Sequence, residues 1–237
     1  METYNQFLDR INSFQNPDFR LGEGKFEVNP NLKMKVAGNN SFKEFYGDTV
    51  VFDLDESVKD ILLKINMDLY KSARKCFCEM LHPDTFHMTL HDLSASQKLS
   101  FASREAFFNE IALIDLLKDT FLCERKILME STCIFNMTNT SLVLGLKPKS
   151  ETEYLKLMNL YKFIDKVRLL PYPFTPHITL AYYSHNGFDY NNKLKLEKIV
   201  NEFNNSEKLT IELNTTNLFY QKFLSMNDYV SVFKLLR

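Results

Sequence analysis

Two short segments of this chain carry the same pattern, a histidine and a threonine separated and followed by apolar residues. Residues 87–90 read His-Met-Thr-Leu, and residues 177–180 read His-Ile-Thr-Leu. In a β-strand successive side chains alternate faces, so the histidine and threonine of each segment project from one face while the apolar residues turn into the core. If the two strands lie side by side, they bring two imidazoles and two hydroxyls together. The candidate catalytic residues are His87, Thr89, His177 and Thr179.

These residue types suit proton transfer around a phosphate. Histidine has an ordinary pKa of about 6.5, so at neutral pH one ring can accept a proton from the nucleophile while the other donates one to the leaving oxygen. Threonine hydroxyls can hydrogen-bond the phosphoryl oxygens, where negative charge builds up in the transition state. The similarity of the two segments leaves open which histidine is the base. It also leaves open whether the natural reaction is hydrolysis or ligation.

The spacing of apolar residues predicts the strands and helices around the first segment. Residues 49–54 alternate like a strand, and apolar residues at helical spacing over 58–69 predict a helix with Ser57 as its N-cap. A loop containing Pro83 precedes the first His-x-Thr segment, and a helix is expected after it at about 102–118.

The elements around the second segment follow in the same order. A strand is expected at 141–146, then a helix opened by the capping-box pair Ser150 and Glu153. Three prolines within 171–176 break the chain just before the second segment, and a helix is expected at 191–205. The repeated order predicts one architecture present twice, with the two His-x-Thr strands meeting at a pseudo-twofold axis.

The two segments resemble the paired His-x-Thr/Ser-x motifs, with x apolar, of the 2H (two-histidine) phosphoesterase superfamily. Residues 176–181, Pro-His-Ile-Thr-Leu-Ala, are especially similar to the second motif of its RNA-ligase-like, cyclic-phosphodiesterase branch. The motif similarity covers about eight positions, and the order of elements extends it over roughly residues 45–235. Many RNA-acting members carry a basic residue just after the second motif. This chain has Tyr182 and Tyr183 there, which argues against recognition of long RNA.

The resemblance implies both a fold and an activity. The expected fold is α+β and bilobal, a duplicated 2H-like architecture in which two antiparallel sheets line a central cleft with helices outside. We expect a single domain over 46–237, with lobes at about 46–137 and 138–237. The expected activity is metal-independent phosphodiester chemistry without a cofactor, on a nucleotide or RNA end that bears a 2′,3′-cyclic phosphate.

Three further residues lie near the two motifs. Strand alternation places His91 on the face of the first motif and Tyr183 on the face of the second, so both are candidate substrate-binding residues. The alternatives are a solvated histidine at a strand end and an aromatic at the rim. His82 lies in the proline loop, and we expect no catalytic role for it. The cluster of His82, His87 and His91 suggests a metal, but zinc needs ligands that converge on one point, so we expect none.

The composition limits the kinds of binding partner that we expect for this protein. The chain has 237 residues, a net charge of −1 and no basic block. A protein that follows long nucleic acid usually has a basic stripe, so a small nucleotide or an RNA end is favoured over a long duplex. No basic and apolar leader is visible at the start, and no apolar run is long enough for a membrane span. The four cysteines do not form a disulfide framework. We expect a cytoplasmic monomer with free thiols and no membrane partner.

The sequence allows alternative roles for the first 45 residues and alternative functions for the whole protein. Residues 1–45 are expected to form an N-terminal extension packed on the domain, with a short strand at 32–36, and a structural role is favoured over substrate binding. The alternative functions are a cyclic-oligonucleotide phosphodiesterase of the same chemistry, a nucleotide- or RNA-binding module without turnover, and a purely structural protein.

Overall fold

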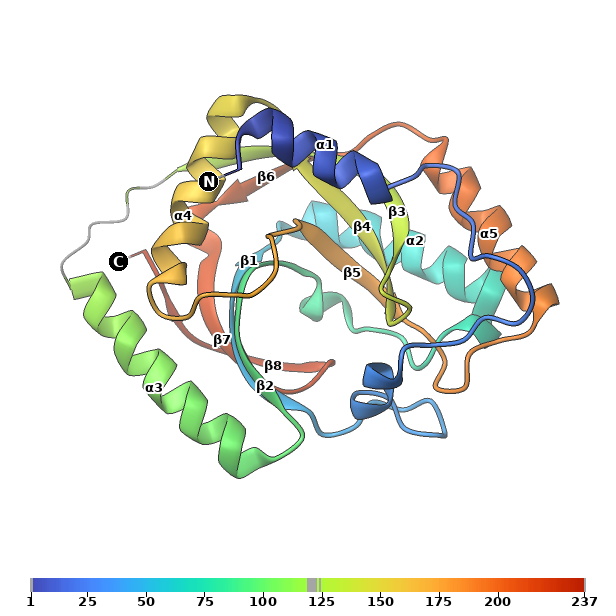
Figure 1. Ribbon diagram of the computed structural model, residues 1–237, viewed down its shortest axis with the longest axis horizontal. Helices are drawn as coiled ribbons and strands as arrows, with labels where there is room; N and C mark the ends of the chain where they lie inside the picture. Colours follow the sequence, from blue (N-terminus) through green and yellow to red (C-terminus); the bar gives the residue numbers. More distant parts are fainter. Residues whose placement is uncertain (1, 119–122, 124, 237) are drawn as a thin grey trace.

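The structure is a computed structural model that describes residues 2–118, 123 and 125–236 (Figure 1). The strands are β1 (Tyr46–Asp53), β2 (His87–Ser96), β3 (Lys126–Met137), β4 (Ser141–Pro148), β5 (His177–Tyr182), β6 (Thr210–Asn214), β7 (Leu218–Ser225) and β8 (Asp228–Lys234). The helices are α1 (Tyr4–Phe14), α2 (Glu56–Ala73), α3 (Leu99–Lys118), α4 (Glu151–Asp165) and α5 (Tyr190–Asn204). Short 3₁₀ turns are η1 (Pro30–Met34), η2 (Arg74–Cys76), η3 (Pro83–Thr85) and η4 (Thr215–Asn217).

All eight strands belong to one curled sheet, which confirms the α+β class and corrects the expectation of two sheets. The strand order is β6-β3-β4-β5-β2-β1-β7-β8, and neighbouring strands are antiparallel. The two halves are joined at the centre because β2 pairs directly with β5, through Met88 opposite Ile178. The two His-x-Thr strands are therefore neighbours in one sheet.

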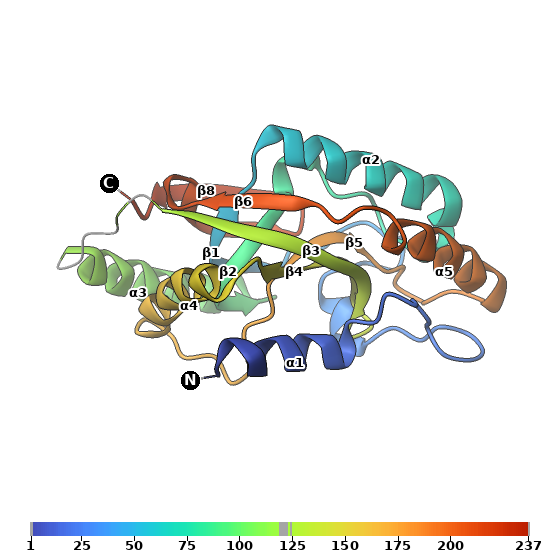
Figure 2. The ribbon, with the colours of Figure 1, turned by 90° about the horizontal axis from the view of Figure 1, so that it is seen from above.

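The helices pack in two groups beside this sheet. In Figures 1 and 2, α2 lies with α5 on one side and α4 lies with α3 on the other. The helix between β1 and β2 thus packs near the other half, where the side-chain amide of Asn66 on α2 donates to the carbonyl oxygen of Leu180 on β5 at 3.0 Å. In the same way α4, which lies between β4 and β5, reaches β2 through Asp165. Each motif strand is therefore braced by a helix from the other half of the chain.

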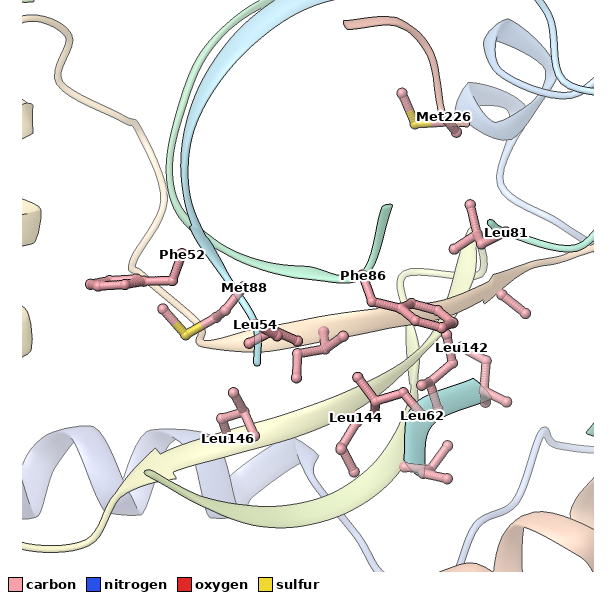
Figure 3. Packing of buried hydrophobic residues seen from close by; sticks show 14 of the residues in the cluster. Phe52, Leu54, Leu62, Leu81, Phe86, Met88, Leu142, Leu144, Leu146 and Met226 are labelled. Carbon is pink, nitrogen blue, oxygen red and sulfur yellow. The ribbon is translucent and has the colours of Figure 1, made fainter. Parts of the chain in front are cut away.

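The apolar residues of both motifs are buried in the main core. Met88 and Ile178 are fully inaccessible, and they pair with Phe52 on β1 and Leu144 on β4. Figure 3 shows Met88 near Phe52 and Leu144 near Leu62 of α2, whose apolar face covers this part of the sheet. Burial of these side chains stabilises the centre of the sheet and turns the alternate residues, the histidines and threonines, to its other face.

Helix starts agree with the sequence in one case and differ in another. Ser150 is the N-cap of α4 and accepts from the backbone N–H of Glu153, as predicted. Helix α2 begins two residues earlier than expected, at Glu56, with Asp55 rather than Ser57 at the N-cap.

The N-terminal region contains no strand at 32–36. Residues 32–34 belong to η1, and residues 35 and 36 follow it. The turn forms here because Pro30 favours a tight turn and the buried side chain of Leu32 anchors it. Helix α1 packs on the body of the protein, with the ring of Phe7 5.2 Å from that of Tyr154 on α4. Figure 2 shows α1 on the opposite side of the sheet from α2.

Candidate active site

The central strand pair places the four predicted catalytic residues on one surface. Met88 lies opposite Ile178 in antiparallel register, so His87 and Thr89 flank this pair on β2, and His177 and Thr179 flank it on β5. All four are half-buried. These four residues are called the two-histidine site below.

The ring of His177 is held by the loop before β5. Its Nδ1 lies 2.8 Å from the carbonyl oxygen of Thr175. In a neutral ring this contact requires the proton to be on Nδ1, which leaves Nε2 free to exchange a proton with a ligand.

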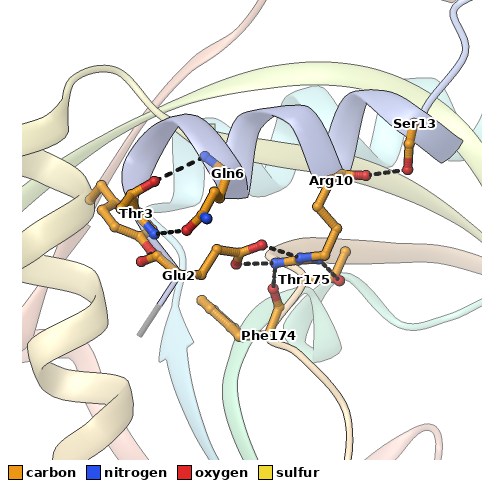
Figure 4. Close-up of polar contacts among 8 residues, drawn as sticks. Glu2, Thr3, Gln6, Arg10, Ser13, Phe174 and Thr175 are labelled. Carbon is orange, nitrogen blue, oxygen red and sulfur yellow. Dashed lines mark hydrogen bonds and ion pairs between the residues drawn. The ribbon is translucent and has the colours of Figure 1, made fainter.

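Helix α1 holds the same loop from outside. The guanidinium of Arg10 donates to the carbonyl oxygen of Phe174 at 2.8 Å and to the hydroxyl oxygen of Thr175 at 3.3 Å (Figure 4). Two further hydrogen bonds tie Arg10 to the carboxylate of Glu2. A residue of α1 thus positions the backbone that orients His177.

The ring of His87 has a matching environment. The backbone of Thr85, two residues earlier, hydrogen-bonds the ring, as Thr175 does for His177. The ring of Tyr229 on β8 meets it edge-on at 5.0 Å. Equivalent backbone contacts therefore orient both imidazoles.

Burial keeps both histidines neutral in the free protein at pH 7. The pKa of His87 is lowered to about 4, mainly by burial and in smaller part by the charged form of His177, while the backbone of Thr85 opposes the shift. Burial also lowers the pKa of His177; the Thr175 backbone and Asp92 oppose this, and Lys35 adds to it. A neutral imidazole is the form that acts as a base.

Both motif strands carry a register irregularity just after their threonine. On β2, Val51 pairs with Thr89 but Val50 pairs with His91, so one extra residue is inserted. On β5, Val143 pairs with Thr179 but Leu142 pairs with Ala181. A bulge of one residue reverses the alternation of faces beyond it.

This reversal overturns the expectation for His91. Its side chain is 1% exposed instead of lining the two-histidine site. Its Nε2 lies 3.0 Å from the carboxylate of Asp165, and its Nδ1 lies 2.6 Å from the carbonyl oxygen of Asp92. With the ring also 4.9 Å from that of Tyr161, His91 connects β2 to α4.

The expectation for Tyr183 is wrong for the same reason. Tyr183 is fully buried, and its ring packs against Phe26 at 4.9 Å and Phe77 at 6.3 Å. It belongs to the aromatic core, where the bulge in β5 has turned it.

The residues that the bulges bring to the site were missed in the sequence. Tyr182 is hydrogen-bonded to Thr179 and donates to the sulfur of Met226 at 3.0 Å. The carboxylate of Asp92 raises the pKa of both His87 and His177. Strict strand alternation assigns both residues to the core face, and no turn residue marks either bulge in the sequence.

A polar cavity of about 450 Å³ adjoins the His87 side of the site. Thr85 and Tyr229, which contact His87, form part of its lining, together with Asp53, Gln221, Asn227 and Ser231. Hydrogen-bonding groups dominate this lining, which suits the hydroxyls and amines of a small polar ligand.

His82 lines the polar cavity but does not belong to the two-histidine site, and none of the described cysteines lines the cavity. His82 is exposed at the start of η3. Over residues 2–118, 123 and 125–236, no group of three or more histidine, cysteine or acidic side chains could hold a metal ion. Cys76, Cys78, Cys123 and Cys133 are free thiols. In this described part of the chain no helix has the length and apolar character to cross a membrane.

Fold and site together define a class of protein, an α+β chain whose single curled sheet pairs two His-x-Thr strands at its centre. Neither a protein-family profile nor a curated protein matches this sequence. Among solved structures, a conserved protein of unknown function from Agrobacterium tumefaciens C58 matches with a TM-score of 0.65 and 13% identity, over 88% of this chain and all of that one. The two proteins share a fold.

Further solved structures match with lower TM-scores. A structure described as a phosphoesterase has a TM-score of 0.45 and 15% identity, over 82% of this chain and 100% of that one. E. coli LigT, complexed with phosphate, has a TM-score of 0.46 and 15% identity over the same shares. At this similarity the activity must be argued from the site itself.

Proposed function

We propose that this protein is a phosphodiesterase of the two-histidine type that opens a 2′,3′-cyclic phosphate on a nucleotide or at an RNA end. The observation that carries the proposal is the pairing of Met88 with Ile178, because it puts both His-x-Thr pairs on one surface. In that register the histidine and threonine of each motif flank this pair on their own strand. A phosphorus centre held between them would be within reach of two proton-transfer groups.

The proposed reaction needs one neutral and one protonated histidine. A neutral histidine takes the proton of the attacking water, the water oxygen bonds to phosphorus, and the bond from phosphorus to one ribose oxygen breaks. The other histidine, protonated, gives its proton to that leaving oxygen. The anionic substrate itself raises the pKa of a nearby imidazole, so one ring can gain a proton on binding although both are neutral in the free protein.

The threonines and the backbone contacts complete the proposed mechanism. Thr89 and Thr179 would donate hydrogen bonds to the non-bridging oxygens as their charge grows. The Thr175 carbonyl keeps the Nδ1 proton of His177 in place, so that Nε2 is the atom that exchanges protons. No step in this mechanism requires a metal ion.

The surroundings support a small substrate. The polar cavity beside His87 is lined by Asp53 and other hydrogen-bonding groups and offers about 450 Å³. A nucleoside attached to the phosphate could occupy it. With a net charge of −1, the chain lacks the excess of cations that long nucleic acid requires.

The test is turnover in the presence of a chelator. Purified protein treated with EDTA is offered 2′,3′-cyclic nucleotides and short RNAs that end in a cyclic phosphate. We expect turnover with a bell-shaped pH profile, and losses on the order of 100- to 10,000-fold for His87→Ala and for His177→Ala. Arg20→Ala, which changes an exposed arginine that lines neither the two-histidine site nor the polar cavity, serves as the control and should keep full activity.

Four results would contradict the proposal. Turnover that disappears with EDTA would indicate a metal enzyme. Turnover that persists in both histidine variants would place the chemistry elsewhere. Binding of the nucleotides without turnover would indicate a nucleotide-binding module, and turnover confined to cyclic oligonucleotides would indicate the alternative substrate class.

A further inference from the structure

The N-terminal region brings one lysine, Lys35, to the two-histidine site. Its ammonium lies 5.3 Å from the centre of the Tyr182 ring and 5.2 Å from that of Phe45. Tyr182 is in turn hydrogen-bonded to Thr179 of the site. The charge of Lys35 also lowers the pKa of His177.

The backbone around Lys35 is firmly held in place. Leu32 and Val36 on either side are fully buried. The backbone N–H of Lys43 donates to the carbonyl oxygen of Lys35 at 2.8 Å, and Val36 forms a bridge with Phe42. The position of Lys35 is therefore set by the fold and is not that of a free surface lysine.

The loop after β5 holds the same segment from the other side. The side-chain oxygen of Asn40 accepts from the backbone N–H of His185 at 2.8 Å and from the hydroxyl of Ser184 at 3.1 Å. The ring nitrogen Nδ1 of His185 lies 2.8 Å from the carbonyl oxygen of Val36. These contacts join the Lys35 segment to the strand that carries His177.

The ammonium of Lys35 lacks a polar partner in this position. Within the described residues it has neither a hydrogen-bond acceptor nor a carboxylate within salt-bridge distance, although the side chain is half-buried. Burial lowers its pKa, and the more distant charge of Asp92 opposes that shift. A partly buried cation normally has an anionic or hydrogen-bonding partner. Two aromatic faces stabilise the charge but leave the N–H donors of the ammonium unused.

We propose that Lys35 binds the phosphoryl oxygens of the ligand at the two-histidine site, so that residues 30–45 form part of the binding site. This inference rests on the proposed function for the nature of the ligand. It differs from the expectation of a purely structural role for the first 45 residues. Directly after the second motif, where many RNA-acting 2H proteins carry a basic residue, this chain has Tyr182 and Tyr183. The proposal therefore assigns the positive charge of the site to a segment far from both motifs in sequence.

The experiment measures binding, so that it does not depend on turnover. Inorganic phosphate and adenosine 2′-monophosphate are titrated into wild-type protein and into Lys35→Met by calorimetry at low ionic strength. Methionine keeps the apolar stem against Tyr182 and Phe45 and removes the charge. A hydrogen bond to a charged group predicts weakening of about 10- to 100-fold for both ligands.

Lys33→Met is the matched control. Lys33 lies in the same segment, two positions earlier and exposed, so its loss should change the affinity by no more than roughly twofold. Thermal unfolding of each variant shows whether it is folded. If Lys35→Met does not fold, Lys35→Gln gives the same comparison with a neutral polar side chain.

The outcomes separate this inference from the proposed function. Phosphate binding that is equally tight in the folded Lys35 variant overturns the inference, even if cyclic nucleotides are turned over. Wild-type protein that binds neither probe overturns it as well. Loss of affinity in Lys35→Met but not in Lys33→Met supports it, even if the wild-type protein turns over no cyclic phosphate.

Discussion

The two candidate catalytic histidines share an equivalent backbone contact and the charge of Asp92 but differ in their other neighbours. His87 is flanked by the ring of Tyr229, and its pKa is lowered, mainly by burial, to about 4. His177 has its Nδ1 on the Thr175 carbonyl and is affected by the charge of Lys35. The protein therefore supplies two imidazoles of the same geometry whose charges are controlled by different neighbours.

The depressed pKa of His87 predicts how stability depends on pH. Its folded-state pKa of about 4 lies below the ordinary value of 6.5, so between these pH values the unfolded chain binds a proton that the folded protein does not. The free energy of unfolding should therefore fall as the pH is lowered from 6.5 towards 4. In His87→Gln this contribution is absent, so the urea midpoint should fall less steeply than in the wild type.

The matching control is a histidine outside the site. His82→Gln changes an exposed ring and should leave the wild-type pH dependence intact. Urea titrations at several pH values between 4 and 7 make the comparison. Equal slopes for His87→Gln and the wild type would contradict the assigned environment of His87.

At the scale of the elements, the site depends on segments that carry no catalytic residue. The loop from Pro171 to Pro176 presents the carbonyl that orients His177, and α1 holds that loop through Arg10 (Figure 4). The bulges in β2 and β5 decide which residues follow the threonines on the site face. The motif strands thus supply the chemistry, and their neighbours determine its geometry.

The role of α1 predicts the effect of Arg10→Met. Loss of the hydrogen bonds to Phe174 and Thr175 should loosen the backbone that holds the His177 ring. We expect kcat to fall by about 10-fold with little change in KM, since proton transfer is sensitive to the position of the acid or base. The ¹⁵N shifts of the His177 ring should also show a mixture of tautomers, a readout that does not depend on the substrate.

Arg20→Met provides the control for this prediction. Arg20 is an exposed arginine that pairs with Asp18 near the surface, so its removal should change neither the rate nor the ring shifts. Unchanged His177 shifts in Arg10→Met would show that α1 does not position the ring.

At the scale of the whole molecule, the N-terminal region is part of the folded body. The ring of Phe7 packs on Tyr154, and Phe7 and Ile11 are buried in the same core as the sheet. The backbone N–H of Phe26 donates to the carbonyl oxygen of Phe188, far along the chain. One sheet runs through both halves of residues 46–237. Their division into two lobes therefore stays a prediction.

This integration predicts a large effect of Phe7→Ala on the stability of the whole chain. Truncation of a buried phenylalanine costs about 3–5 kcal/mol. The free energy of unfolding measured with urea should fall by that amount in one cooperative transition. Phe14→Ala, at the exposed end of α1, should cost clearly less. An unchanged main transition in Phe7→Ala would show that the first residues are only an appended extension.

The sequence alone predicted the local structure around the two motifs. The strands, the α4 cap at Ser150 and the burial of Met88 and Ile178 follow from side-chain alternation and capping, which act over a few residues. The outward direction of His87 and Thr89 follows from the same alternation. A copied pattern of this kind is visible without any knowledge of the fold.

Only the tertiary structure decided which distant residues meet. The fusion of the expected two sheets, the burial of His91 and the arrival of Lys35 each depend on contacts between segments far apart in the chain. A bulge inserts one residue and reverses the side chains that follow it, and it forms against a neighbouring strand that lies far away in the sequence. For that reason the chemistry of this protein is visible in its sequence, whereas the surroundings that control it come from the packing of the whole chain.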